Sequence, residues 1–203
     1  MSGLCSDFHY QSVPRLHTQP VIGFNVNFAP VMDVDSNPAN PVIGDRSFGA
    51  DPRTVMRHGI AYIRGLQAER VLACAKHFPG HGDTQSDSHF SMPSIDADID
   101  RLRSVELVPF QQAIDADLDA IMTAHIALPN AAEDPGLPAT LSAKLINDEL
   151  RGHMGFDGIV MTDGLEMRGI VDRYGSGMAA VRAVQAGADM AMILWTNAKK
   201  DEV

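Results

Sequence analysis

The residues best suited to chemistry are gathered in one short stretch of the chain, KHFPGHGDTQSDSHFSMP, which runs from Lys76 to Pro93. Its 18 residues include three histidines, two aspartates and one lysine. Pro79, Gly80 and Gly82 are incompatible with a regular helix, so we expect a long loop. Loops of this length inside compact domains usually carry function, and the titratable side chains strengthen that expectation.

Asp87 and His89 in this loop are separated by one residue, so in an extended segment both side chains can project to the same side. A carboxylate bonded to one imidazole nitrogen fixes the tautomer, orients the ring and leaves the other nitrogen to exchange a proton near neutral pH. The pair therefore suits general acid–base catalysis. The same spacing is also typical of a solvated histidine beside a helix-capping aspartate, and for the two residues taken alone this second interpretation is favoured.

Metal binding is a second chemistry to weigh, because the loop holds several possible ligands: His77, His81, Asp83, Asp87 and His89. His77 and His81 are four residues apart, but Pro79 and Gly80 between them exclude the single helix on which that spacing forms a zinc site. A metal-dependent hydrolase is therefore the less favoured alternative. We expect no metal and no other cofactor.

Asp163 and Lys76 both stand at the ends of apolar runs. Asp163 follows GIVMT directly, and a carboxylate at the carboxyl end of a buried strand is a candidate nucleophile or electrostatic stabiliser. A cap on the following helix explains the same aspartate equally well. Lys76 ends an apolar run where an unpaired charge costs free energy, so we expect a polar cleft at that strand end.

Arg46 lies in the turn-rich segment NPVIGDRSFG, after the first apolar run. An arginine there can clamp a polar substrate, or it can pair with Asp33 or Asp45. For Arg46 alone, the structural ion pair is the default interpretation.

The elements that must position these residues alternate along the chain. We predict strands over residues 25–31, 71–76, 120–125, 158–162 and 189–194, because each is a short apolar run bounded by turn residues. Their near-continuous apolar character suits strands buried on both faces of a sheet. Helical periodicity predicts helices over 52–69, 98–115, 142–150 and 176–186, with Asp51 as a cap before Pro52 and a division at Pro109.

Alternating strands and helices imply right-handed crossovers and a parallel α/β sheet. Polar residues directly after the strands, and the absence of a glycine-rich dinucleotide fingerprint, favour a barrel: Asp33, Lys76, His77, His125 and Asp163. A closed barrel needs eight strands, whereas about five are visible. We therefore predict an α/β fold of the (β/α)8 TIM-barrel type that is only partly present, with an open sheet as the alternative.

Composition bounds the function classes. The 203 residues are 45% hydrophobic and 21% charged, which is typical of one globular unit. The formal net charge of −10 disfavours nucleic acid and anionic membranes as partners. No apolar stretch approaches the roughly 20 residues of a membrane span, and the first residues lack a signal-peptide pattern. We expect a cytoplasmic protein, on the condition that Met1 is the natural start.

Three segments together resemble the β-N-acetylhexosaminidases of glycoside hydrolase family 3. They are KHFPGHGDTQSDSH, the upstream FAPVMDVDSNPANPVIGDRSFG and the downstream PATLSAKLINDELRGHMGFDGIVMTDGLEM. Their order and spacing are similar to the family from about Gly23 to Leu194. We therefore interpret residues 23–203 as an incomplete catalytic barrel domain and leave residues 1–22 unassigned.

The resemblance implies a retaining hydrolase, without a metal, that removes terminal β-linked N-acetylglucosamine from oligosaccharides or muropeptides. By position, Asp163 matches the family's nucleophile, His89 its acid/base and Asp87 the partner that supports His89. Three further residues match those that hold the sugar's hydroxyls: Arg46, Lys76 and His77. A retaining mechanism needs an anion to capture the oxocarbenium-like centre and a proton donor for the leaving oxygen, and these residues provide both.

The chain also departs from the family. Nothing matches the D-Q-E-G-G-type segment that grips the sugar from an earlier strand, and the family continues beyond Leu194. We therefore expect that this stretch alone hydrolyses poorly or not at all. A β-glucosidase of the same superfamily and a catalytically silent carbohydrate-binding fragment are the alternatives.

Overall fold

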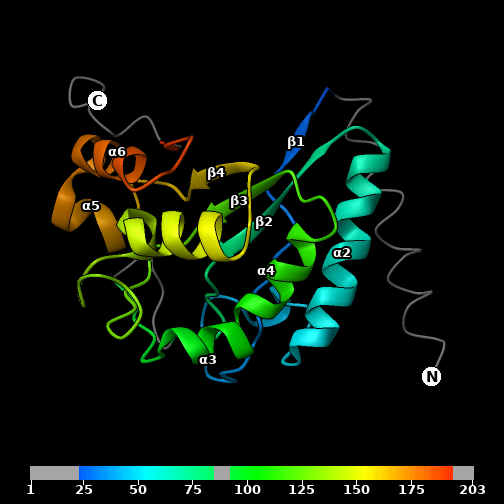
Figure 1. The fold of residues 1–203 in the computed structure, drawn as a ribbon, viewed down its shortest axis with the longest axis horizontal. Helices are drawn as coiled ribbons and strands as arrows, with labels where there is room; N and C mark the ends of the chain where they lie inside the picture. The colour runs from blue at the N-terminus through cyan, green and yellow to red at the C-terminus, as the bar shows by residue number, and fades with distance from the viewer. Residues whose placement is uncertain (1–22, 85–91, 194–203) are drawn as a thin grey trace.

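Parallel strands form the sheet in the part of the chain that the computed structural model describes, residues 23–84 and 92–193. The four strands are β1 (Val26–Asn27), β2 (Leu72–Phe78), β3 (Ala120–Thr123) and β4 (Ile159–Thr162), and they lie in that order (Figure 1). Each falls inside or against a segment predicted as a strand. The sheet is fully parallel, as the alternation of strands and helices predicts.

The two outer strands are shorter than predicted. β1 covers two residues, although Val31 further along pairs with Lys76 through an isolated parallel bridge. The fifth predicted strand, residues 189–194, contributes a single bridge from Met190 to Met161, and residue 194 lies outside the described part. Strands at the margin of an incomplete barrel lack the neighbour that would complete their hydrogen-bond ladder, and this explains their short length.

The helices follow the predicted periodicity closely at their starts. α2 (Pro52–Ala68) begins where the Asp51 carboxylate accepts the backbone N–H groups of Arg53 and Thr54, and Pro52 occupies the first helical position. α6 (Ser176–Gln185) ends one residue before the predicted end. The segment predicted from Ser142 is a π-helix, η3 (Lys144–His153), and the Ser142 hydroxyl accepts the Leu145 N–H at its start.

The division within residues 98–115 is confirmed, but its predicted cause is wrong. The break between α3 (Ile99–Ser104) and α4 (Leu107–Ile114) falls at residues 105–106, before Pro109. Pro109 is the third residue of α4, where a backbone N–H has no partner inside the helix, so proline is tolerated there. Three short elements were not predicted: η1 (Gly44–Arg46), η2 (Ala139–Leu141) and α5 (Arg168–Tyr174).

The two faces of the sheet have different neighbours. Ala73, Ile121 and Val160 point toward the helices and join the large core, to which all the main helices contribute buried residues. The alternate positions point the other way and form a second, smaller cluster: Cys74, Ala120, Met122, Met161 and Met192. Within the described residues this second face is not covered by helices. It is the side that faces inward in a barrel.

The apolar residues at the margins of this inner face stay partly exposed. Leu72 is 39% exposed and Met190 is 49% exposed. The expectation of strands buried on both faces therefore holds for the middle of the sheet and not for its edges. Exposed apolar residues at the edges are expected for an inner barrel face that lacks its remaining strands. The fold is therefore consistent with a partial (β/α)8 barrel.

Candidate active site

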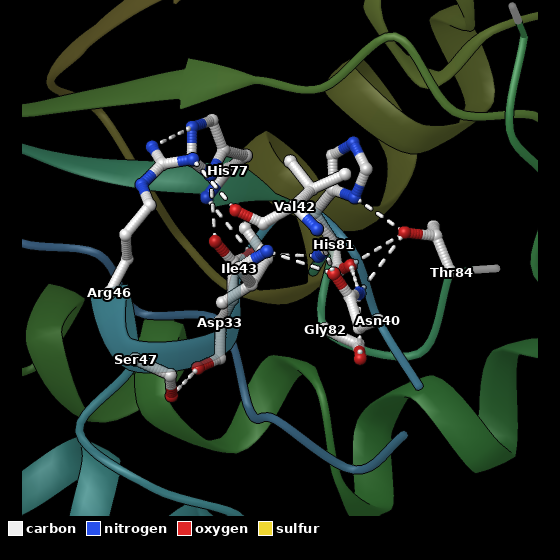
Figure 2. A network of polar contacts seen from close by, with 10 residues as sticks. All are labelled: Asp33, Asn40, Val42, Ile43, Arg46, Ser47, His77, His81, Gly82 and Thr84. Carbon is white, nitrogen blue, oxygen red and sulfur yellow. Dashed lines mark hydrogen bonds and ion pairs between the residues drawn. The ribbon is translucent and has the colours of Figure 1, made fainter. Parts of the chain in front are cut away.

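Asp33 is the centre of the polar network at the carboxyl end of β2 (Figure 2). Its side chain is fully buried. Oδ1 accepts the backbone N–H of His77 at 3.2 Å and that of His81 at 2.7 Å, and Oδ2 lies 2.7 Å from Nδ1 of the His77 ring. One carboxylate therefore joins the end of β1, the end of β2 and the start of the long loop.

The charge of Asp33 is stabilised by these partners. Burial by itself raises the pKa of the carboxyl group, but attraction to His77 and the hydrogen bonds from His77 and His81 outweigh it, so the pKa of Asp33 lies below its ordinary value. A buried carboxylate that accepts several hydrogen bonds is a strong constraint on the groups that donate them.

Asn40 ties the loop that contains Arg46 to the loop that follows β2 (Figure 2). Its amide nitrogen donates to the carbonyl oxygens of His81 at 2.8 Å and Gly82 at 3.0 Å, and its oxygen accepts the N–H groups of residues 42 and 43. Gly82 fits because a Cβ there would lie 1.8 Å from the carbonyl oxygen of Val34. The start of the long loop is thus held against the segment after β1.

Arg46 extends toward His77 (Figure 2). Its Nη1 donates to the Val42 carbonyl at 3.3 Å, and Nη2 makes a long contact of 3.5 Å with Nε2 of His77. Among the described residues, the ion pairs of the structure include none between Arg46 and Asp33 or Asp45. The default interpretation of a structural ion pair is therefore wrong, and the exposed guanidinium is available to a ligand.

Lys76 stands at the polar end of β2, as predicted, and is half-buried. Burial and the neighbouring charge of Arg46 lower the pKa of Lys76, while attraction to Asp163 opposes that shift. Lys76 is therefore near enough to both Arg46 and Asp163 for their charges to act on it. Two cations and a carboxylate thus face the same end of the sheet.

Asp163 follows β4 directly, and its backbone N–H donates to the Thr123 carbonyl at 3.2 Å. One carboxylate oxygen accepts the N–H of Gly164 at 2.8 Å. The next helix, α5, begins at Arg168 with Met167 before it, so Asp163 does not cap that helix. The capping interpretation is therefore wrong, and a partly exposed carboxylate at the carboxyl edge of the strands is left for another role.

His125 is a residue of the site for which the sequence predicted no role. It is buried at the end of β3, with Nε2 3.0 Å from the Gly164 carbonyl and Nδ1 2.8 Å from Oγ1 of Thr140. Burial lowers the pKa of His125, although attraction to Asp163 opposes the shift. A neutral His125 that donates from Nε2 holds the turn carrying Asp163. Its position after an apolar strand is the one sequence feature that points to it.

The structure therefore brings together four of the six predicted site residues: Arg46, Lys76, His77 and Asp163. Asp87 and His89 lie outside the described residues, so their roles stay predictions. Within residues 23–84 and 92–193, no group of three or more histidine, cysteine, aspartate or glutamate side chains is arranged to hold a metal ion. A helix long and apolar enough for a membrane span is likewise absent from this part of the chain.

The comparisons with known proteins agree on one family. The Glycosyl hydrolase family 3 N terminal domain matches residues 17–202, beginning within the segment that the motifs leave unassigned. Beta-hexosaminidase A of Pseudoalteromonas piscicida is 41% identical over 182 residues, covering 85% of this chain and 30% of that protein. A "Beta-N-acetylglucosaminidase/beta-glucosidase" of Cellulomonas fimi is 36% identical, over 83% of this chain and 31% of that protein.

A solved structure is similar in both sequence and shape. The glycoside hydrolase family 3 beta-N-acetylglucosaminidase from Paenibacillus sp. str. FPU-7 superposes with a TM-score of 0.89 and 45% identity, over 92% of this chain and 35% of that one. The chain thus spans about a third of the length of each of these three proteins. The family resemblance and the partial barrel predicted from the sequence are confirmed.

Proposed function

The chain belongs to glycosyl hydrolase family 3, and from this premise we propose that it forms much of the active site of a retaining β-N-acetylhexosaminidase. The proposal rests on one observation: Arg46, Lys76, His77 and Asp163 all lie at the carboxyl edge of the sheet, where Arg46 contacts His77 and Lys76 interacts with the charges of Arg46 and Asp163. Barrel enzymes build their active sites at this edge, from residues that follow different strands.

The first step of the proposed reaction belongs to Asp163. Its carboxylate attacks the anomeric carbon from the face opposite the leaving group, and the bond to the leaving oxygen breaks as a glycosyl–enzyme ester forms. Lys76 lies close enough to interact electrostatically with Asp163, and His125 holds the adjacent Gly164 carbonyl. These neighbours support a carboxylate that is fixed in place for the attack.

His89 supplies the proton in that step and removes one in the next. As an imidazolium it protonates the leaving oxygen, and as a neutral base it accepts a proton from the water that hydrolyses the ester. Its reference pKa of about 6.5 suits both states near neutral pH. Asp87 supports His89 in this proposal. Most retaining enzymes use two carboxyl groups, so a histidine in this role is unusual.

N-acetylglucosamine is the sugar that the named relatives support best. The names of the Pseudoalteromonas and Paenibacillus proteins point to N-acetylhexosamine substrates. The name of the Cellulomonas relative includes β-glucosidase activity, and this keeps a glucoside as the second candidate. We further propose an oligosaccharide or muropeptide as the natural substrate, because a terminal N-acetylglucosamine occurs in both.

Steady-state rates on 4-nitrophenyl β-N-acetylglucosaminide and on the matching β-glucoside test the proposal, measured at high protein concentration because the partial barrel is expected to turn over slowly. We expect faster turnover of the N-acetylglucosaminide and loss of that turnover in Asp163→Asn. Asp172→Asn is the matched control, because the Asp172 carboxylate is exposed and pairs with Arg168 within α5. A faster reaction on the glucoside would favour the second candidate. Full activity of Asp163→Asn would contradict the mechanism.

A further inference from the structure

We propose that Asp33 is a positioning residue that holds His77 in the tautomer with its proton on Nδ1, so that Nε2 faces Arg46 and the sugar as a hydrogen-bond acceptor. The tautomer depends on the contacts of the ring alone, whereas its consequence for sugar binding rests on the proposed function.

The Asp33 carboxylate determines which nitrogen of the His77 ring carries the proton. An ionised carboxylate only accepts hydrogen bonds, so the nitrogen that lies 2.7 Å from Oδ2 must donate. That nitrogen is Nδ1 of His77. In a neutral imidazole one nitrogen carries the proton, and the other nitrogen, Nε2, then presents its lone pair.

Arg46 acts on the other side of the same ring. Arginine only donates hydrogen bonds, and Nη2 of Arg46 lies 3.5 Å from Nε2 of His77. A lone pair on Nε2 attracts this guanidinium, whereas a proton on Nε2 would face another donor. Both neighbours of the His77 ring therefore favour the same tautomer.

Asp33 is itself held in place on several sides. Its backbone carbonyl accepts the Ser47 hydroxyl at 2.7 Å (Figure 2), and the N–H of the preceding residue, Met32, donates to the Lys76 carbonyl at 2.6 Å. The Asp33 carboxylate also accepts the N–H of His81 at 2.7 Å. Asp33 thus positions the His77 ring and the start of the loop together.

Asp33→Asn should change the tautomer of His77. The backbone N–H groups of His77 and His81 determine the orientation of the new amide. The oxygen of the substituted side chain must take the Oδ1 position, where the N–H groups of His77 and His81 arrive. Its NH₂ group then lies opposite Nδ1 of His77, which has to become an acceptor. The proton moves to Nε2, where it points at Arg46.

This switch should weaken sugar binding. A sugar hydroxyl can accept a hydrogen bond from Nε2 instead of donating one to it. The Arg46 guanidinium can only donate, so a proton on Nε2 displaces the guanidinium from the ring. Misplacement of a contact residue by about 1 Å lowers catalytic efficiency by about 100-fold. We expect a loss of kcat/KM of that order in Asp33→Asn.

Nitrogen-15 NMR of histidine-labelled protein at pH 8 tests the tautomer without any substrate, because the two ring nitrogens have different shifts when one carries the proton. The His77 signals are identified by their loss in His77→Asn. We expect a proton on Nδ1 of His77 in the wild type and on Nε2 in Asp33→Asn. A wild-type ring with its proton on Nε2, or on both nitrogens, would overturn the proposal even if the variant failed to fold.

Asp119→Asn is the matched control. The Asp119 carboxylate also accepts a backbone N–H, that of Ala73 at 3.0 Å, but it lies at the opposite end of the sheet and its side-chain partner is Gln67 instead of a histidine. It should leave both the His77 tautomer and kcat/KM unchanged. If the His77 tautomer also changed in Asp119→Asn, loss of a distant carboxylate would be enough to move the proton. That result would refute the specific role of Asp33. The expected tautomers in a protein that neither binds nor hydrolyses an N-acetylglucosaminide would contradict the proposed function and leave the role of Asp33 supported.

Discussion

Two buried histidines lie at the carboxyl ends of the neighbouring strands β2 and β3, and their surroundings differ in one decisive way. Nδ1 of His77 meets a carboxylate, and its Nε2 faces the exposed guanidinium of Arg46. Both nitrogens of His125 meet uncharged groups of the protein interior, the Thr140 hydroxyl and the Gly164 carbonyl. A histidine with one nitrogen toward a solvent-accessible cation can take part in ligand binding. A histidine with both nitrogens occupied inside the core is suited to positioning.

This difference separates binding from support at the same sheet edge. His77 and Arg46 form the part that a sugar can reach, and Asp33 holds that part in place. His125 contacts the carbonyl of Gly164, the neighbour of Asp163, which is the proposed nucleophile. The two histidines are equivalent in the sequence, because each simply follows an apolar strand.

The largest expected effect comes from replacing each histidine by asparagine, whose amide nitrogen or oxygen can take the place of Nδ1 but not that of Nε2. His77→Asn keeps the bond to Asp33 and removes the ligand-facing nitrogen. We expect kcat/KM to fall by about 10- to 100-fold with little change in stability. Turnover of 4-nitrophenyl β-N-acetylglucosaminide and urea unfolding measure the two quantities.

His125→Asn should lower the free energy of unfolding, whereas His77→Asn should change it little. It leaves the Gly164 carbonyl without its donor and opens a small cavity in the core, which should cost about 2 to 3 kcal/mol in the free energy of unfolding. The same urea titration measures this loss. Similar stability losses in the two asparagine variants would break the distinction between the two histidines.

A second, smaller effect concerns pH. Burial lowers the pKa of His125 in the folded protein, so the unfolded chain binds this proton more readily. The stabilising contribution of neutral His125 is complete above the unfolded pKa of about 6.5 and is lost as the pH falls toward the lower folded pKa. The contribution of this one group to the slope cannot exceed about 1.4 kcal/mol per pH unit.

His125→Gln should reduce this dependence. The glutamine amide can still donate to the Gly164 carbonyl but does not titrate. We expect the free energy of unfolding to fall less steeply between about pH 6.5 and pH 5 in the variant than in the wild type. Equal slopes in the two proteins would contradict a buried, neutral His125.

The smallest expected effect is that of Thr140→Val, which removes the hydroxyl beside Nδ1 of His125 and keeps the shape of the side chain. The same hydroxyl also lies within hydrogen-bond distance of the Thr123 hydroxyl and the Ala124 carbonyl, so its removal should cost about 1 to 2 kcal/mol. Thr54→Val provides the comparison, because the Thr54 hydroxyl bonds the exposed Asp51 cap. A loss no larger than that of Thr54→Val would show that the hydroxyl does not support the ring.

The sheet and its polar edge could be predicted from the sequence because both depend on local patterns. Apolar runs identify the strands, and a charged residue at the end of a run, such as Lys76 or Asp163, identifies the edge. Asp33 could be placed after a strand but its role could not be predicted, since its partners His77 and His81 are 44 and 48 residues away along the chain. Which of several polar groups pair across such distances is decided by tertiary packing.

Two local interpretations fail for the same reason. A pair between Arg46 and a nearby aspartate, and a helix cap at Asp163, are both arrangements that are common for neighbours in sequence. In the fold, Arg46 turns toward the ring of His77, which lies near the end of β2. The helix after Asp163 begins five residues later, at Arg168. At both positions, contacts with residues distant in the sequence, His77 for Arg46 and Thr123 for Asp163, replace the expected local ones.

The most direct test of the central claim is to trap the sugar on the nucleophile. The protein is incubated with an N-acetylglucosaminyl fluoride that carries a second fluorine on the ring, which slows formation and hydrolysis of the ester while keeping a good leaving group. Mass spectrometry of the digested protein should then find one added sugar on the peptide that contains Asp163, and none in Asp163→Asn. Steady hydrolysis of the chromogenic substrate with the label on another carboxylate would contradict the account.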